Sequence, residues 1–351
     1  DYIENHAAAD GVKIKVAGPS AWCAQLEGSK DFSKAFMGRH NIPTARYQSF
    51  QLTELDAAAE FMKTLEPPYV LKADGLAAGK GVIITSSFEE ACLTLKEMTD
   101  GSRFGKAGEV VVIEEFLKGI ELSVFGVSDG KDWKVLASAK DYKRIFDNDE
   151  GPNTGGMGAI SPVPFADEAF MKKVFDRILK PTYDGLVAEG HPYKGFLFVG
   201  LMNVGGEPLV IEYNVRMGDP ETEAIFPRLK TSMLDLLEAV ADEKLNQIEI
   251  ELDDRTAATI FLVSGGYPGD IEKGKVIALP SNLGQDQWLF QAGTKLVGQE
   301  IQTNGGRVIA VTSLGVDIPL ALDRSRKLAD EVHFEGKFHR TDIGMDLMRL
   351  L

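Results

Sequence analysis

The stretch LVIEYNVRMGDPETE, residues 209–223, places several chemically active residue types directly against a buried strand. It opens on three apolar residues, a pattern typical of such a strand. Glu212 and Asn214 follow two positions apart, so in a strand their side chains point to the same face. A carboxylate and an amide oxygen on one face form a hard, oxygen-only site suited to magnesium. Arg216 lies on that face as well if the strand extends to it.

The second half of this stretch ends the strand. Gly218 and Pro220 break the extended pattern, which places Asp219 and Glu221 in a turn. The alternative is a strand with a solvated end and a surface ion pair. The functional interpretation is favoured because four polar residue types adjoin one buried strand, although the pattern E-x-N-x-R is only moderately specific by itself.

The composition is that of a globular protein, with 44% apolar and 26% charged residues in a chain of 351. This length allows two or three domains, and no apolar run is long enough to span a bilayer. The formal net charge of −15 argues against non-specific binding to nucleic acid or membranes, which requires a basic surface. Cys23 and Cys92 lack metal-type spacing and are too few for a disulfide framework, so a reducing cytoplasm is the expected location.

The first 28 residues are expected to be the remnant of an N-terminal domain. Residues 1–9 have the pattern of a helix end and residues 12–17 that of a short strand. Since one helix and one strand cannot bury a core, we expect an N-terminal portion to be missing. Ser29 is then expected to cap a helix over 30–40, in which Lys30 and Lys34 lie one turn apart, usually a merely solvated arrangement. Thr53 is the expected cap of a second helix, over 53–65.

Residues 69–85 predict a strand, a glycine-rich loop ADGLAAGKG (73–81) and a second strand. This order is a hairpin, not the strand, loop and helix of a P-loop, and the glycine spacing differs from the P-loop as well. The loop is suited to a flap whose backbone N–H groups approach phosphates. An ordinary glycine-rich hairpin is the alternative. Lys72 argues against it, because this charge ends an apolar strand where only a ligand anion is expected to compensate it.

The middle of the chain alternates buried strands with polar loops. Residues 110–116, 121–127 and 135–139 are expected strands, and adjacent Glu114 and Glu115 must face opposite ways. The segment DYKR (141–144) is a charged strand end. The loop GPNTGGMG (151–158) has four glycines in eight residues and suits closure over a ligand, with a plain surface loop as the competing interpretation.

The rest of the chain predicts further regular elements. A helix over 165–189 is expected to kink near Pro181, followed by a strand over 196–204 and a helix over 232–242 capped by Ser232. Beyond about residue 253 the pattern changes to short strands (257–263, 288–292 and 308–313) with a helix over 319–332. This pattern indicates a small α+β domain that packs on the larger one.

The combination of motifs is more specific than any one of them. KADGLAAGKGV, IEEFLKGIELS, GPNTGGMGA and IEYNVRMGDPETE occur in this order, and SKDFSKAFM, GGYPGD and TNGGRV accompany them. Together they resemble the ATP-grasp ligases, and within these the phosphoribosylamine–glycine ligase family, over essentially the whole chain. The chain departs from the family in two respects. The family's N-terminal Gly-Gly-Arg-Glu loop is absent, and the strand 198–201 lacks the second metal carboxylate that many ATP-grasp enzymes carry.

The resemblance implies a fold of the α/β and α+β class, an ATP-grasp fold in which two α+β subdomains clasp ATP. The expected divisions are the N-terminal remnant at 1–28, the ATP-grasp domain at 29–252, with a mobile ATP lid at about 68–127, and a C-terminal domain at 253–351. It also implies ligation of glycine to 5-phosphoribosylamine through glycyl phosphate, which gives glycinamide ribonucleotide, ADP and phosphate in purine biosynthesis. The alternatives are another ATP-grasp carboxylate–amine ligase and a non-catalytic ATP-binding module.

The resemblance further implies ATP as co-substrate, Mg²⁺ or Mn²⁺ as the metal, small-molecule partners only, and a monomer, with a dimer as the alternative. Adenine would be read by Glu114 with backbone groups of Glu115 and Leu117, the ribose by Glu121, and the sugar 5′-phosphate by Arg307, for which a solvated arginine is the alternative. The implied site residues are, for catalysis, Lys72, Arg216 and Asp219; for ATP, Lys30, Lys72, Gly75, Gly79, Lys80, Gly81, Glu114, Glu115, Leu117 and Glu121; for the substrates, Asp141, Lys143, Arg144, Asn153, Thr154, Gly155, Gly156, Pro220 and Arg307; and for the metal, Glu212 and Asn214.

Overall fold

The computed structural model describes residues 3, 6, 11, 14–75, 81–99 and 105–350, with the backbone alone at 106 and 107. The helices are α2 (Gln25–Gly28), α3 (Lys30–Arg39), α4 (Leu55–Met62), α5 (Phe88–Thr99), α6 (Glu168–Val174), α7 (Lys180–Ala188), α8 (Glu221–Ile225), α9 (Met233–Ala241), α10 (Ile318–Glu331) and α11 (Met345–Met348). The strands are β1 (Tyr47–Gln51), β2 (Tyr69–Ala73), β3 (Val82–Thr85), β4 (Val110–Glu115), β5 (Ile120–Asp129), β6 (Trp133–Asp141), β7 (Arg144–Phe146), β8 (Glu150–Asn153), β9 (Gly158–Ser161), β10 (Lys194–Val204), β11 (Glu207–Asn214), β12 (Thr256–Val263), β13 (Gln287–Gln291), β14 (Thr294–Val297), β15 (Glu300–Thr303) and β16 (Arg307–Gly315).

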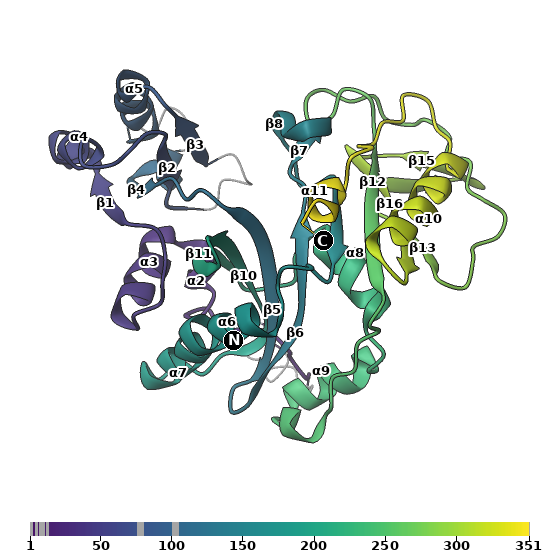
Figure 1. Cartoon of the computed structure of the whole chain (residues 1–351), viewed down its shortest axis with the longest axis horizontal. Coiled ribbons are helices and arrows are strands. Elements are labelled where there is room, and N and C mark those ends of the chain that lie inside the picture. The colour runs from purple at the N-terminus through teal and green to yellow at the C-terminus, as the bar shows by residue number, and fades with distance from the viewer. Residues whose placement is uncertain are drawn as a thin grey trace.

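An eight-stranded antiparallel sheet runs through the centre of the molecule in the order β11-β10-β5-β6-β9-β12-β16-β13 (Figure 1). Its strands β5 and β10 are paired over ten positions, from Lys194 opposite Asp129 to Asn203 opposite Ile120. Strand β9 pairs with β6 on one side and with β12 on the other. The sheet therefore crosses residue 253, where the composition changes, without a break in its hydrogen bonding. The expected C-terminal α+β unit is a continuation of the central sheet.

A smaller sheet in the order β1-β4-β2-β3 stands apart from the central one (Figure 1). Helices α4 and α5 cover one face, where Phe50, Leu71 and Ile113 belong to a closed apolar core. The opposite face carries Lys72, with Ile84 52% exposed on the edge strand. Alternation along each strand explains this division, because neighbouring side chains point to opposite faces. The small sheet takes in β1 and leaves out β5, so it begins and ends earlier than the 68–127 segment expected from the sequence.

The helix ends test the capping predictions. The cap at Ser29 is confirmed, since its hydroxyl accepts a hydrogen bond from Phe32 N at 3.0 Å. The predicted cap at Thr53 is wrong, because Gln51 and Glu54 form a capping box over a short 3₁₀ turn and α4 starts two residues after Thr53. The Ser232 cap of α9 is confirmed.

The long helix expected over 165–189 is interrupted, as predicted. It consists of α6 and α7 with a single π-helical turn between them at Phe175–Leu179. Pro181 lacks a backbone N–H and its ring crowds the preceding turn, which fits a wider turn at this point. The helix packs beside β11, the strand that carries Glu212.

Two other expectations are wrong. The part of the expected strand at 12–17 that the structure describes, residues 14–17, has no regular structure. Residues 294–303, for which no strand was predicted, form the hairpin β14–β15. The expected helix at residues 1–9 lies mostly outside the described residues.

Candidate active site

A buried charge cluster joins α3 to strands β2 and β4 of the small sheet. Glu114 on β4 lies 3.1 Å from Nζ of Lys34 and 3.0 Å from Nζ of Lys72, and its side chain is 4% exposed. The sequence prediction that only a ligand anion compensates Lys72 is therefore wrong, because Glu114, 42 residues away, already faces it. The expectation that Lys34 is solvated is wrong as well, since its side chain is 2% exposed.

Lys30 lies near this cluster at the start of α3. Its ammonium donates to Gly75 O at 3.3 Å, at the beginning of the glycine-rich loop. Burial lowers the pKa of Lys30, and Lys72 adds to this effect while Glu212 opposes it. Gly81 accepts from Ala73 N at 2.8 Å and closes the loop on its far side. The predicted contacts Gly79 and Lys80 lie outside the described residues.

The two adjacent glutamates of β4 face opposite ways, as predicted. Glu114 is buried, whereas Glu115 is partly exposed and accepts from Arg46 N at 2.8 Å. Leu117 follows in the connection to β5, partly buried. This connection links β4 of the small sheet to β5 of the central sheet.

Strand β11 presents the predicted metal ligands on one face. Nδ2 of Asn214 lies 3.5 Å from Oε1 of Glu212. The strand ends at Asn214, so Arg216 lies beyond it, yet its guanidinium still donates to Asn214 Oδ1 at 3.3 Å. Glu27 holds this arrangement: it pairs with Arg216 at 3.0 Å and accepts from Val215 N at 2.8 Å. One carboxylate and one amide oxygen are the donor types that a hard divalent cation prefers, so this pair fits such an ion.

Next to β11, a second charge cluster lines a narrow pocket between the strands of the central sheet. Nζ of Lys143 lies 2.6 Å from Glu121 and 3.9 Å from Asp141. The ammonium of Lys143 lowers the pKa of the Glu121 carboxyl, whereas burial raises that of Asp141. Burial alone would lower the pKa of Lys143, but Asp141, Glu121 and Glu212 outweigh it and raise this pKa well above its usual value. Residues predicted for ATP, substrate and metal thus line one pocket.

At the other end of the site, Arg307 and Asp219 form a bidentate ion pair. Both nitrogen–oxygen distances are 2.7 Å, and the same guanidinium donates to Gly155 O at 2.8 Å. The guanidinium also lies over the ring of Phe261, 4.6 Å from its centroid. Arg307 is therefore not the solvated strand-end arginine that was its alternative, because its side chain is 20% exposed and fully engaged.

The glycine-rich loop that follows β8 is fixed to its surroundings at several points. Thr154 bonds through its backbone N and its hydroxyl to Lys143 O, both at 2.8 Å. Gly156 has a φ of +117°, and a Cβ there would lie 2.3 Å from the ring of Pro220. Gly155 N donates to the hydroxyl of Tyr267 at 3.0 Å. The loop thus connects the pocket around Lys143 with the Asp219–Arg307 pair.

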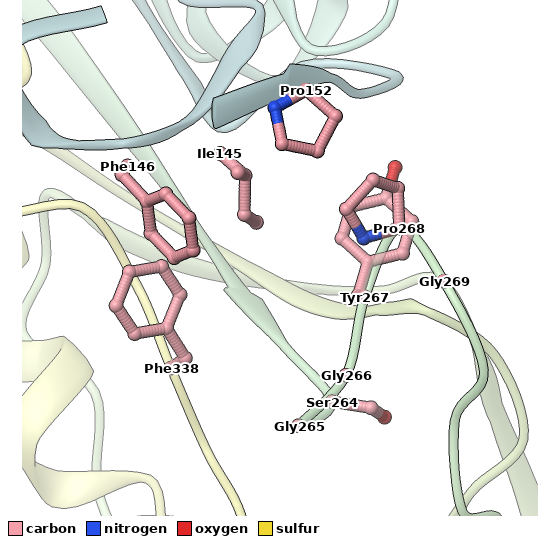
Figure 2. Close-up of a pocket in the computed structure, with 10 residues that line it drawn as sticks. All are labelled: Ile145, Phe146, Pro152, Ser264, Gly265, Gly266, Tyr267, Pro268, Gly269 and Phe338. Atoms are coloured by element: carbon pink, nitrogen blue, oxygen red, sulfur yellow. The ribbon is translucent and has the colours of Figure 1, made fainter. Parts of the chain in front are cut away.

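A cavity of about 630 Å³ adjoins this loop. Figure 2 shows Phe146 and Phe338 facing each other on one side and Pro152, Tyr267 and Pro268 on the other. The motif GGYPGD therefore lines this cavity, and the hydroxyl of its Tyr267 contacts the glycine-rich loop at Gly155. The lining is apolar apart from backbone groups and the hydroxyls of Ser264 and Tyr267.

Two predicted substrate residues are not brought into this constellation. Arg144 and Asn153 are partners in the small β7–β8 ladder, where Arg144 donates to Gly151 O at 2.6 Å. Both are exposed. Their contacts stabilise the hairpin, and the structure shows none between them and the ion pair of Arg307.

Glu221 and Ser123 belong to the site although no role was predicted for them. Glu221 was expected in a turn, but it is the first residue of α8 and is 3% exposed. It accepts from Ser123 Oγ at 3.1 Å, and burial followed by the nearby Asp141 raises its pKa to about 8. A Cβ on Gly218 would lie 2.4 Å from Glu221 Oε2, which explains a glycine at that position. Spacing alone gave no signal for this contact.

Within the described ranges, no three His, Cys, Asp or Glu side chains come together in a way that could hold a metal ion. The assignment of Glu212 and Asn214 as metal ligands stays a prediction from the sequence. None of the helices in the described part of the chain combines the length and apolar character needed to cross a membrane.

The small and central sheets, together with the charged residues on β2, β4 and β11, define an ATP-grasp ligase. The biotin carboxylase domain of Hydrogenobacter thermophilus 2-oxoglutarate carboxylase, solved with MgADP, ADP and bicarbonate, shares this fold with a TM-score of 0.73 at 16% identity, covering 96% of this chain and 72% of that one. ATP-grasp ligases use ATP together with a divalent metal ion. The chain belongs to the phosphoribosylglycinamide synthetase family of ATP-dependent carbon–nitrogen ligases, since the models of its ATP-grasp (A) domain and C domain match residues 28–222 and 257–346.

Individual relatives agree with this assignment. Phosphoribosylamine–glycine ligase of Vibrio cholerae is 46% identical over 333 residues, which are 94% of this chain and 77% of that protein. The same enzyme of Escherichia coli O157:H7 is 46% identical over 334 residues, again 94% and 77%. The crystal structure of phosphoribosylamine–glycine ligase from Thermotoga maritima is similar with a TM-score of 0.86 at 39% identity, covering 93% of this chain and 81% of that one.

Proposed function

We propose that this chain ligates glycine to 5-phosphoribosylamine at the expense of ATP, giving glycinamide ribonucleotide, ADP and phosphate. The observation that carries the proposal is a series of charged groups that contacts connect from the small sheet to Arg307. Lys72 and Glu114 stand at one end, Glu212 with Arg216 in the middle and Arg307 at the other end. This order matches a reaction in which a phosphoryl group is transferred from the nucleotide to a carboxylate, and the activated carboxylate then reacts with an amine.

The chemistry requires activation of a poor electrophile. A carboxylate oxygen of glycine attacks the γ-phosphorus of ATP, the bond to ADP breaks, and glycyl phosphate forms. The amine of phosphoribosylamine then attacks the acyl carbon, phosphate leaves, and the amine loses one proton. Phosphoryl transfer mainly needs positioning and charge neutralisation, which the lysines and Arg216 would supply.

At the nucleotide end, the exposed face of the small sheet would cover ATP. Lys72 and Lys30 would neutralise the α- and β-phosphates, and the glycine-rich loop would cover them. Ile84 is half exposed on this face, where an adenine ring would bury it. Glu114 and Glu121 would contact the base and the ribose.

Glu212 and Asn214 would hold the metal ion, and we propose Mg²⁺ or Mn²⁺. When bound, the ion would reduce the negative charge of the phosphate groups. Arg216, fixed by Glu27, is aimed at the same region and would stabilise the charge on the transferred phosphoryl group. Because Nε and Nη2 of Arg216 both donate to Oε1 of Glu27, the side chain loses less conformational entropy when substrates bind.

At the acceptor end, the Asp219–Arg307 pair favours a zwitterion over a phosphate. The carboxylate of Asp219 would repel a dianionic sugar phosphate, whereas glycine offers an ammonium for Asp219 and a carboxylate for Arg307. The assignment of Arg307 to the sugar 5′-phosphate stays a prediction from the sequence. The variants Arg307→Lys and Asp219→Asn distinguish glycine binding from sugar-phosphate binding at this pair. In our proposal, both variants raise the KM for glycine about tenfold or more and leave the KM for phosphoribosylamine unchanged.

The function is tested by ADP release in the presence of magnesium with each acceptor in turn. We expect rapid release only with glycine and phosphoribosylamine together, and capture of glycyl phosphate as a hydroxamate when hydroxylamine replaces the amine. Release dependent on bicarbonate would instead identify a carboxylase. ATP binding without any turnover would identify a non-catalytic nucleotide-binding module.

We further propose that the chain acts as a monomer in a reducing cytoplasm. Cys23 and Cys92 are both free thiols, and burial raises the pKa of each, which keeps them protonated and unreactive. Light scattering at working concentration tests the monomer, with a dimer as the alternative outcome.

A further inference from the structure

The ammonium group of Lys34 makes its contacts with other groups of the protein. It lies on α3 with 2% of its side chain exposed, 3.1 Å from Glu114 Oε2. It donates to Thr44 Oγ1 at 2.7 Å, and it stands over the ring of Tyr47, 5.3 Å from the centroid. A carboxylate, a hydroxyl and an aromatic face thus surround three N–H groups. Lys34 therefore has no donor left for a ligand.

Lys72 is held much more loosely. Its ammonium lies 3.0 Å from Glu114 Oε1, yet within the described part of the chain this oxygen accepts no well-aligned hydrogen bond. Its other contact, to Ile211 O, is 3.5 Å long and correspondingly weak. Lys72 lies on the face of the small sheet opposite the core that α4 and α5 cover, so its remaining donors can turn to a ligand bound on that face.

The cluster of Lys34, Lys72 and Glu114 contains two positive charges and one negative charge, so one positive charge is not neutralised. Two ammonium groups share the single carboxylate of Glu114, and all three side chains are at most 7% exposed. A buried charge without a partner is costly, so such a cluster is stable when an anion can approach. Burial lowers the pKa of Lys34 to about 8, which leaves it mostly charged at neutral pH.

We propose that Lys34 is a positioning residue that occupies Glu114 and thereby frees Lys72 for the phosphates of the nucleotide. Without Lys34, Glu114 and Lys72 would form a closed one-to-one pair that competes with ATP. With Lys34 in place, Glu114 keeps a partner when Lys72 turns to a phosphate, so no buried carboxylate is left unpaired. The inference rests on the proposed function of Lys72.

The same contacts connect the cluster to the metal-binding strand. Thr44 accepts from Lys34 and donates to Val210 O at 2.6 Å, and Val210 is two residues from Glu212. Figure 1 shows α3 lying close to both the small sheet and β11. Lys34 thus holds Glu114 at a fixed place relative to the strand on which the metal would bind.

The test compares ATP with adenosine, which has the same base and ribose but no phosphate. Lys34→Met keeps the side-chain volume and removes the charge. We expect calorimetry to show a loss of ATP affinity of about 10- to 100-fold, the range for one hydrogen bond to a charged group. The inhibition constant of adenosine should stay unchanged. Equal losses for both ligands would mean that Lys34 only supports the fold of the pocket, which would overturn the proposal.

A second background sharpens the test. In Glu114→Gln the carboxylate that competes for Lys72 is absent, so Lys34→Met added to it should change ATP affinity by less than about threefold. This comparison cancels any contact of Glu114 with adenine, because both proteins lack it. A loss in the Glu114→Gln background as large as in the parent would contradict the proposal.

Two controls separate the possible failures. Lys72→Met must weaken ATP binding; if it does not, the proposed role of Lys72 fails. If Lys72→Met weakens binding and Lys34→Met does not, only the present inference fails. Arg39→Met removes an exposed charge from the same helix, where it pairs with the partly buried Glu189, and should leave both affinities unchanged. The double variant removes both members of the buried pair and keeps the test available if Lys34→Met alone unfolds.

Discussion

Glu212 is the residue whose position follows most directly from the sequence. Its spacing from Asn214 places both side chains on one strand face, and the structure has them 3.5 Å apart. We expect Glu212→Gln to lower the rate of ADP formation at saturating magnesium by at least about 100-fold, because it removes the one carboxylate of the metal shell.

The fold of this variant should be intact, because Glu212 is an exposed side chain. The matched control is Glu207→Gln at the other end of the same strand, where the carboxylate pairs with surface lysine and arginine side chains. It should retain normal turnover. Near-normal ADP formation in Glu212→Gln would rule out its metal role.

Other residues of the site could not be predicted because their partners are far away in sequence. Lys34 and Lys30 show helical spacing, but only the fold brings Glu114 to one of them and Gly75 to the other. Glu27 carries no motif signal, and its role arises from its position beside Arg216. Local period predicts which side chains share a face, whereas the identity of a buried counter-ion depends on tertiary contacts.

At the scale of the element, the loop after β8 depends on a glycine. Gly156→Ala would place a Cβ 2.3 Å from the Pro220 ring in a left-handed backbone conformation. We expect turnover to fall about tenfold or more with ATP affinity unchanged, because a displacement near 1 Å costs up to about 100-fold in rate. Gly190→Ala is the control, with a φ of +82° but open space around its Cβ. A normal rate in Gly156→Ala would show that the loop does not position substrate.

Helix α8 supplies a pH-dependent contribution to stability. The pKa of Glu221 is raised to about 8 in the folded protein and is near 4.5 when unfolded, so the folded state favours the protonated carboxyl. This contribution is complete below about pH 4.5 and is lost as the pH rises through 8. We expect the melting temperature to fall from pH 5 to pH 9 in the parent and less in Glu221→Gln, by roughly 2–4 °C for each kcal/mol of difference.

The control for this prediction removes a carboxylate from an equivalent position. Glu168 is the first residue of α6 and is exposed, so Glu168→Gln should leave the pH dependence of the melting temperature as in the parent. Identical pH profiles for Glu221→Gln and the parent would contradict the assignment of the buried carboxyl.

Elements with a strong period were predictable, and those defined by tertiary partners were not. The strands β2, β4, β5, β10 and β12 follow their apolar runs. Strand β8 reads EGPN, a sequence without strand propensity, and is extended only because Arg144 pairs with Asn153 across the hairpin. The Thr53 cap failed because Thr53 lies inside a 3₁₀ turn over Leu52–Glu54, which Gln51 and Glu54 cap before α4 begins.

At the scale of the molecule, one buried arginine ties the C-terminal segment to the β7–β8 hairpin. Arg340 is 1% exposed and pairs with Asp342 at 2.7 Å and Asp149 at 2.8 Å. It also donates to Arg144 O at 3.1 Å. We expect Arg340→Met to lower the free energy of unfolding by about 3 kcal/mol, because it removes a buried cation on which three acceptors converge.

Urea denaturation measures this change. Arg177→Met is the control, since Arg177 forms an exposed ion pair, for which about 0–1 kcal/mol is usual. Equal midpoints for the two variants would show that Arg340 does not hold the segment. If the segment positions the loop after β8, Arg340→Met should also raise the KM for glycine at a temperature where the protein remains folded.

The division near residue 253 stays a prediction from the sequence, whereas the strand pairing across it could not be predicted. The change of composition near residue 253 indicates a separate unit, because short strands and turns replace longer elements. The register of the central sheet is set by side chains from both sides of that position, with Ala257 opposite Ser161 and Ile260 opposite Gly158. Pairing between strands nearly 100 residues apart leaves no local trace in the sequence.

The pairing between β9 and β12 has a consequence for dividing the protein into two fragments. A chain cut between α9 and β12 would leave each fragment with one unpaired strand edge, and each edge has its complement only on the other fragment. We expect the halves to aggregate when made alone and to reassemble when co-expressed. This pairing makes the molecule a candidate for a complementation reporter. Growth without supplied purines would then show that two proteins fused to the fragments bind each other.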